Sequence, residues 1–115
     1  MVAKHNWTIK QGSTWRKTFY YEEEDGTPIN LAGFSAKMQI RESYNSPVLI
    51  TLTTDNSKII ITPVEGKIVL YLTRSETAAL NFDKAVYDLD IYQGDEIKTL
   101  LEGCVVLNKQ VTRNV

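Results

Sequence analysis

Residues 85–107, AVYDLDIYQGDEIKTLLEGCVVL, predict two long β-strands joined by a tight turn. The first strand alternates apolar and polar residues, which is the period of a strand with one buried face. Its inward set is Ala85, Tyr87, Leu89 and Ile91. The segment 93–96 supplies the turn, with Gly94 as its most permissive residue. Leu100-Leu101 followed by Gly103 interrupts the second strand and predicts a bulge or bend.

The rest of the chain predicts sheet that pairs with this hairpin. Short alternating or β-branched runs at 5–10, 14–21, 33–41, 48–53, 58–62 and 66–72 predict further strands. Thr73 and Glu76 have capping-box spacing, which predicts one short helical turn near 74–80. The expected fold class is all-β: a single antiparallel β-sandwich, immunoglobulin-like or similar, of about eight strands. A small closed barrel is the rival fold.

The chain has the size and composition of one domain, spanning residues 1–115. Its 43% hydrophobic residues suffice for a core, and the ends at 1–5 and 110–115 are expected to be flexible. The net charge of −1 comes without any basic block, which argues against nucleic-acid binding. No run of about 18 apolar residues and no signal peptide is visible, which argues against a membrane span.

Catalytic and metal-binding constellations are sparse. Cys104 is the only cysteine, so no intrachain disulfide forms, and its setting predicts a small buried side chain. His5 is the only histidine, and no phosphate-binding motif occurs. Asp88 and Asp90 share one strand face, as paired carboxylates do in some hydrolases. Their favoured interpretation is surface charge paired across strands with basic residues, for which the candidates are Lys37, Arg41 and Lys98. No cofactor or metal site and no catalytic residue is predicted.

Six aromatic residues are candidates for a carbohydrate-binding platform, although the core or a protein contact is the preferred place for most of them. They are Trp7, Trp15, Tyr20, Tyr44, Tyr71 and Tyr92.

Four segments together resemble small tailed-bacteriophage proteins of the tail and baseplate: 11–15, 25–34, the strand at 87–89, and 100–103 with 111–113. The pattern is also similar to the N-terminal β-sandwich of phage baseplate upper proteins, which anchors receptor-binding parts to the virion. Those proteins continue into long C-terminal regions, whereas this sequence stops at Val115, which favours a small adaptor. The resemblance implies no catalytic residues.

The predicted function is therefore that of a non-enzymatic virion structural protein in a phage tail or baseplate, acting by protein–protein contact. Its expected partners are tail, baseplate or fibre subunits and further copies of itself, assembled in the host cytoplasm and carried in the virion. The predicted contact residues are apolar side chains on outward faces and the C-terminal tail: Ile60, Val69, Tyr71, Tyr92, Val111, Thr112 and Arg113. The alternatives are a capsid-decorating or head-to-tail connector protein, a carbohydrate-binding module, and a hydrolase using Asp88 and Asp90.

Overall fold

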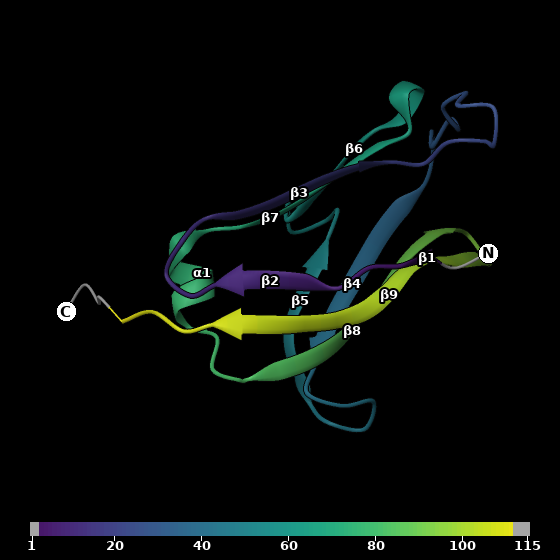
Figure 1. Ribbon diagram of the computed structural model, residues 1–115. Coiled ribbons are helices and arrows are strands. Elements are labelled where there is room, and N and C mark those ends of the chain that lie inside the picture. The colour runs from purple at the N-terminus through teal and green to yellow at the C-terminus, as the bar shows by residue number, and fades with distance from the viewer. Residues whose placement is uncertain (1–2, 112–115) are drawn as a thin grey trace.

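Two separate β-sheets pack face to face in the computed structural model, which describes residues 3–111 (Figure 1). The larger sheet has the order β1-β9-β8-β4-β5, and β2 also pairs with β9; the smaller has the order β3-β7-β6. The elements are β1 (Ala3–Lys4), β2 (Trp7–Lys10), β3 (Trp15–Tyr20), β4 (Ser35–Arg41), β5 (Val48–Thr53), β6 (Ile59–Thr62), η1 (Pro63–Glu65), β7 (Lys67–Leu72), α1 (Arg74–Ala78), β8 (Lys84–Gln93) and β9 (Glu96–Asn108). The two ladders do not join into a barrel, so the predicted sandwich is confirmed and the rival fold is wrong.

The hairpin of β8 and β9 is the largest paired unit of the fold. Pairing runs from Lys84 opposite Val106 to Gln93 opposite Glu96, and Gly94 takes φ +58° in the turn. The ladder passes from Leu89 opposite Leu101 to Asp90 opposite Thr99, so Leu100 is an extra residue on β9. The predicted bulge is therefore confirmed. Both leucines of the pair are buried, because the bulge turns two consecutive side chains toward the core.

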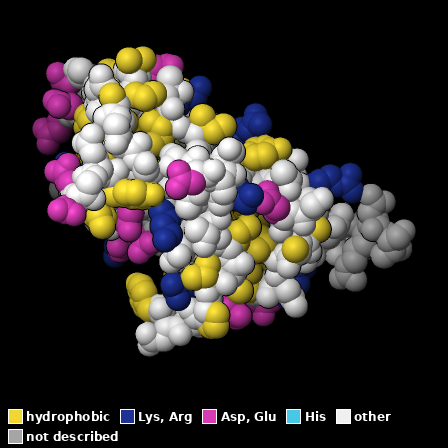
Figure 2. Space-filling model, turned by 180° about the vertical axis from the view of Figure 1, so that it is seen from behind, with side chains coloured by type: hydrophobic (Ala, Val, Ile, Leu, Met, Phe, Trp, Pro, Cys, Tyr) yellow, Lys and Arg dark blue, Asp and Glu magenta, His cyan; other side chains and the backbone are white. Residues whose placement is uncertain are grey.

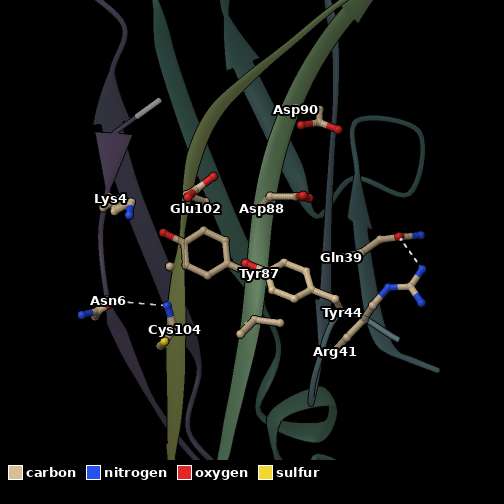
Figure 3. A pocket seen from close by; sticks show the side chains of 12 residues that line it. Lys4, Asn6, Gln39, Arg41, Tyr44, Tyr87, Asp88, Asp90, Glu102 and Cys104 are labelled. Atoms are coloured by element: carbon tan, nitrogen blue, oxygen red, sulfur yellow. Dashed lines mark hydrogen bonds between the residues drawn. The ribbon is translucent and has the colours of Figure 1, made fainter. Parts of the chain in front are cut away.

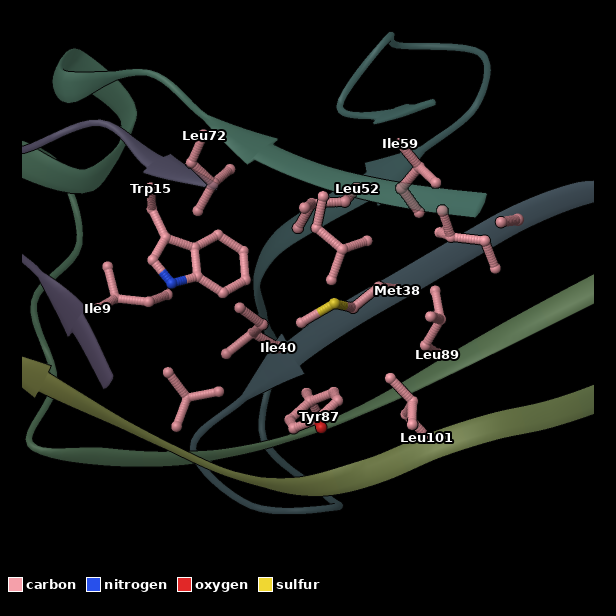
Figure 4. Packing of buried hydrophobic residues seen from close by; sticks show 14 of the residues in the cluster. Ile9, Trp15, Met38, Ile40, Leu52, Ile59, Leu72, Tyr87, Leu89 and Leu101 are labelled. Atoms are coloured by element: carbon pink, nitrogen blue, oxygen red, sulfur yellow. The ribbon is translucent and has the colours of Figure 1, made fainter. Parts of the chain in front are cut away.

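The core fills the space between the sheets with residues of β2 to β9, which alternate along most strands and are consecutive at the bulge of β9 (Figure 4). Trp7 stacks on Tyr87 with ring centroids 4.4 Å apart and an interplanar angle of 15°, and it lies tilted against Trp15 at 5.5 Å. Lys17 shares the inward parity of Trp15 on β3 but is exposed, because β3 is an edge strand and the sandwich is open there. Cys104 is only half-buried, on the outward side of β9, so the prediction of a buried side chain is wrong.

The first strand is held against β9 through a kink at His5 and Asn6. The His5 N–H donates to the carbonyl of Glu102 at 3.0 Å, and the Cys104 N–H donates to Asn6 Oδ1 at 3.0 Å. β1 and β2 flank this kink and both pair parallel with β9. Ala3 and Lys4, which belong to the N-terminal end predicted to be flexible, thus form strand pairs; residues 1–2 and 112–115 lie outside the described part.

Tyr87 and Gly103 also hold the kink at His5 and Asn6 against β9, and we call this set of contacts the N-terminal lock. The Tyr87 hydroxyl donates to the His5 carbonyl at 2.7 Å, and burial first, then the nearby Cys104 and Glu102, raise the Tyr87 pKa above its usual value. Gly103 is the residue directly opposite Tyr87, and a Cβ there would lie 2.0 Å from the His5 oxygen. The close approach of the N-terminal strand therefore requires glycine at this position.

The predicted helical turn is present as α1, which lies at one end of the sandwich (Figure 1). Thr73 and Glu76 form the full capping box. The buried Thr77 hydroxyl donates to the Ser13 carbonyl at 2.8 Å and accepts from the Gly12 N–H at 3.0 Å, which ties the turn to the β2–β3 connection. Within residues 3–111, no helix has the length and apolar character needed to span a membrane.

Candidate functional site

Three of the predicted contact residues meet on the outward face of the β3-β7-β6 sheet. Ile60 on β6 lies directly opposite Val69 on β7, and Val69 lies opposite Thr18 on β3. Tyr71 is two residues along β7 and is covered by the Arg16 guanidinium, 5.1 Å from the ring centroid. Ile60 is 54% exposed, while Val69 and Tyr71 are half-buried. This face therefore carries a short apolar row, Ile60 and Val69, which we call the apolar row, and the Arg16–Tyr71 cation–π pair lies next to it.

The other predicted contact residues do not join this row. Tyr92 lies on the opposite sheet, where it is half-buried and pairs with Ser35 on β4 and Ile97 on β9. Ile97 itself is 66% exposed, and sequence reasoning did not select it. Val111 is 96% exposed, whereas Thr112 and Arg113 lie outside the described residues. Figure 2 shows hydrophobic side chains reaching the surface in several separate places on the face it presents.

A cavity of about 660 Å³ lies on the outward face of the larger sheet (Figure 3). Its floor comes from outward residues of β4, β8 and β9, and its rim includes Lys4, Asn6 and Tyr44. Tyr44, in the β4–β5 loop, is 84% exposed. Asp88 and Asp90 were predicted to lie on a plain solvent-facing surface; they do face outward, but this surface is hollowed and they line the hollow.

Three carboxylates give the cavity floor its negative character. Asp88 lies opposite Glu102 on β9 and opposite Gln39 on β4. Partial burial, then Asp90, then Glu102 raise the pKa of Asp88 above its usual value, and Arg41 opposes this rise. Ionised Asp88 is therefore disfavoured in the folded protein compared with a carboxylate free in water.

The predicted ion pairs to these aspartates do not form within residues 3–111. Asp90 instead accepts a hydrogen bond of 2.6 Å from the Thr99 hydroxyl. Arg41 Nη1 donates to the Ser46 carbonyl at 2.8 Å, and Nη2 donates to Gln39 Oε1 at 3.1 Å. The guanidinium is thus engaged in holding the β4–β5 loop, so it acts on Asp88 only through space.

The residues that could carry catalysis are not brought together. His5, the only histidine of the sequence, lines a different opening from the one that holds Asp88, Asp90 and Cys104. In the part of the chain that the structure describes, no group of three or more His, Cys, Asp or Glu side chains is arranged to hold a metal ion.

The six aromatic candidates are spread over the molecule. Trp15 is buried in the core and Trp7 is half-buried against it, Tyr20 and Tyr71 lie outward on the smaller sheet, and Tyr92 lies on the larger one. Only Tyr44 borders the cavity as an exposed ring. A single flat aromatic platform is therefore not formed.

A second opening of about 340 Å³ lies where the two sheets separate beside β3. It is lined on one side by Lys17, Phe19 and their neighbours on β3, and on the other by Trp7, Leu100 and Leu101. We call this opening the β3 cleft; its full lining is His5, Trp7, Lys17, Thr18, Phe19, Tyr20, Tyr21, Leu100 and Leu101. Sequence reasoning missed it, although the uneven alternation around Lys17 was a signal.

Comparison with known proteins bears on the fold. No protein-family model matches the sequence, and no curated protein matches it. A chain in a crystal structure of a chicken TCR is similar in structure, with a TM-score of 0.56 and 12% sequence identity. The similarity covers 97% of this chain and 56% of the TCR chain, so this chain spans about half the length of that one. The chain thus has the fold of an immunoglobulin-like β-sandwich.

Proposed function

We propose that the protein is a non-enzymatic structural subunit of a tailed-phage virion, an adaptor in the tail or baseplate that acts by protein–protein contact. The identity of the particle comes from the resemblance of its turn and strand segments to tail and baseplate proteins. In this proposal its partners are other virion proteins and further copies of itself, and it is carried in the virion after assembly in the host cytoplasm.

The observation that carries the contact role is the apolar row on the smaller sheet. Ile60 exposes 54% of its surface directly beside Val69, so a partner that covers the row removes apolar area from water. The Arg16–Tyr71 pair next to it adds a residue type that interfaces favour, since aromatic residues and arginine are enriched there. The row is small, which suits one of several contacts in a multi-subunit particle better than a large isolated dimer interface.

Particle composition tests the proposal directly. Mass spectrometry of purified virions is expected to detect the protein at a copy number typical of a structural subunit, and cryo-EM is expected to place its density in the tail. Density on the capsid or at the head-to-tail junction would instead support the decoration or connector alternative. Complete absence from purified particles would refute both.

A matched pair of variants tests the apolar row. Ile60→Lys places a charge in the row, whereas Val64→Lys changes an equally apolar, more exposed residue in η1, away from it. Both variants are expected to fold, because both side chains are largely outside the core. Incorporation into particles is expected to fall for Ile60→Lys alone; equal incorporation of the two variants would remove the row from the interface.

The cavity on the larger sheet favours glycan binding as a second candidate function. It combines an exposed tyrosine ring with the amide and carboxylate groups that hydrogen-bond sugar hydroxyls, on Asn6, Gln39, Asp88 and Glu102. Glycan-array binding that is lost in Tyr44→Ala and retained in Tyr92→Ala would support this function. An array without signal would refute it.

A further inference from the structure

One edge of the smaller sheet is bare. β3 pairs only with β7, and the Tyr21 N–H that follows the strand donates to Gly66 beside β7 at 2.7 Å. Because N–H and C=O groups alternate in direction along a strand, Lys17 and Phe19 share the orientation of Tyr21 and bond to β7. The N–H and C=O groups of Arg16, Thr18 and Tyr20 therefore point away from β7, toward the free edge.

The other sheet edges are closed in ways that β3 is not. On β5, the side chain of Asn56 donates to the Thr51 carbonyl at 3.0 Å and accepts from the Thr53 N–H at 2.9 Å, occupying the edge as a neighbouring strand would. The β6 edge is four residues long, and the first strand is kinked between β1 and β2. Among the described strands, β3 therefore offers the longest edge without such protection, six residues in length.

The fold itself explains why this edge is open. In the constant-type immunoglobulin fold the first strand belongs to the same sheet as the second, and there it covers that strand's outer edge. Here both parts of the first strand, β1 and β2, pair with β9 in the other sheet. The place that a first strand would fill beside β3 is left unoccupied by the described residues.

The β3 cleft specifies the chemistry of a strand that would fill this place. A strand added to β3 would direct every second side chain between the sheets, where the cleft offers Phe19, Leu100 and Leu101. Lys17 also lines the cleft from the inward side of β3, and no acidic side chain is among the lining residues. An incoming strand therefore fits with a large apolar residue opposite Phe19 and a carboxylate opposite Lys17.

We propose that an extended segment of a neighbouring protein adds antiparallel to the free edge of β3, placing an acidic side chain at Lys17 and an apolar one at Phe19. This inference rests on the proposed contact function and assigns it a site separate from the apolar row. Main-chain hydrogen bonds to Arg16, Thr18 and Tyr20 hold the segment, and the cleft selects its side chains.

A synthetic peptide tests the proposal on the intact protein. The probe is Ser-Thr-Ile-Thr-Glu-Thr-Ile-Thr-Ser, which can place Glu at Lys17 and Ile at Phe19. On binding, NMR hydrogen exchange is expected to slow at the amides of Arg16, Thr18 and Tyr20, while those of Lys17 and Phe19, already bonded to β7, change little. Replacing Glu by Lys in the peptide is expected to weaken binding about tenfold.

Two matched controls separate strand addition from binding of side chains alone. N-methylation of the two Thr residues that flank Glu blocks amides that face β3 and is expected to abolish binding, whereas N-methylation of the two Ile residues blocks outward amides and is expected to spare it. In the protein, Thr18→Pro removes one edge-facing N–H without breaking the bonds to β7, so peptide binding is expected to weaken. Thr18→Val retains that N–H and is the matched control, in which binding is expected to be kept. Lys17→Glu is expected to reverse the preference between the Glu and Lys peptides.

The outcomes are decisive in either direction. Protection of the even-numbered amides, together with loss of binding in the first methylated peptide, supports strand addition. Absence of peptide binding to a monomeric protein overturns it, as does binding that survives both methylations. A dimer that Thr18→Pro converts to monomer would show that a second copy occupies the edge and would overturn the assignment to another protein. Because none of these measurements depends on finding the protein in virions, strand addition and the virion proposal fail independently.

Discussion

Gly103→Ala is the substitution that most directly tests how the first strand is held. The added Cβ would lie 2.0 Å from the His5 carbonyl oxygen and 2.9 Å from its carbon, distances that real Cβ contacts do not reach. The contact is with backbone, so no side-chain rotation relieves it. The kink at His5 and Asn6 must therefore move away from β9.

The cost follows from the hydrogen bonds that cross this contact. Movement of the kink breaks the bonds from His5 to Glu102, from Cys104 to Asn6 and from Tyr87 to His5. At about 1 kcal/mol for each bond, offset by the 0.5–1 kcal/mol or so that alanine gains over glycine in a strand, the net loss is about 2 kcal/mol. For a domain of this size that loss lowers Tm by about 8 °C.

Urea denaturation of four proteins measures this effect: wild type, Gly103→Ala, Tyr87→Phe and the double variant. Tyr87→Phe alone is expected to cost about 1 kcal/mol, and to cost almost nothing once Gly103→Ala has broken the same hydrogen bond. Gly26→Ala is the control, because Gly26 has φ +89° and no neighbour within 4 Å, so its cost is backbone strain without coupling to Tyr87. A Gly103→Ala variant within 0.5 kcal/mol or so of wild type, or strictly additive costs, would refute the lock.

Three further substitutions test other parts of the structure. Burial raises the pKa of Glu76, but the Lys58 ammonium and hydrogen bonds from Thr73 outweigh it, so the pKa is lowered. Ionised Glu76 therefore stabilises the fold at pH values above the usual pKa of 4.5, and this stabilisation is lost as pH falls through the lowered pKa. Glu76→Gln should therefore flatten the acid side of a plot of Tm against pH. Asp88 has a raised pKa, so its negative charge destabilises the fold as pH rises above the usual pKa of 3.8. Asp88→Asn should therefore raise the free energy of unfolding at neutral pH, by no more than about 1 kcal/mol. A lower Tm of the variant in thermal unfolding would contradict this. Asn56→Ala uncovers the β5 edge, so the variant should associate with rising concentration in light scattering. The control Asn45→Ala, in an exposed loop, should stay monomeric. If Asn56→Ala is monomeric at all concentrations, Asn56 does not protect the edge.

The strands, the capping box and the bulge could be predicted because each depends on local pattern. Alternation along 85–92 places side chains on two faces regardless of what packs above, and Thr73 and Glu76 satisfy each other within one turn. The position of the bulge within Leu100-Leu101 could not be predicted, and it decides which face Ile97 takes. Counting by twos from Leu101 directs Ile97 inward, but the extra residue at Leu100 reverses the parity and leaves it exposed beside Tyr92.

The two openings depend on relations between sheets that no single segment encodes. The cavity beside Asp88 needs the β4–β5 loop to bring Tyr44 over strands that lie more than 40 residues further along the chain. The β3 cleft exists because the first strand pairs with β9 and not with β3. Lys17 was the one local sign of this pairing in the sequence. A charged side chain at an inward position costs free energy in a closed core, but at an open edge the ammonium reaches water and this cost is avoided.

The N-terminal lock and the bare edge of β3 are two consequences of one arrangement. His5 and Asn6 are fixed on β9 because Gly103 allows close approach and Tyr87 reaches the His5 carbonyl, and a strand held there cannot also pair with β3. The hydrogen bonds that stabilise the isolated domain therefore also keep the β3 edge available. Under the strand-addition proposal, pairing the first strand with β9 leaves the β3 edge free to accept an extended segment of another protein, without any change to β3 itself.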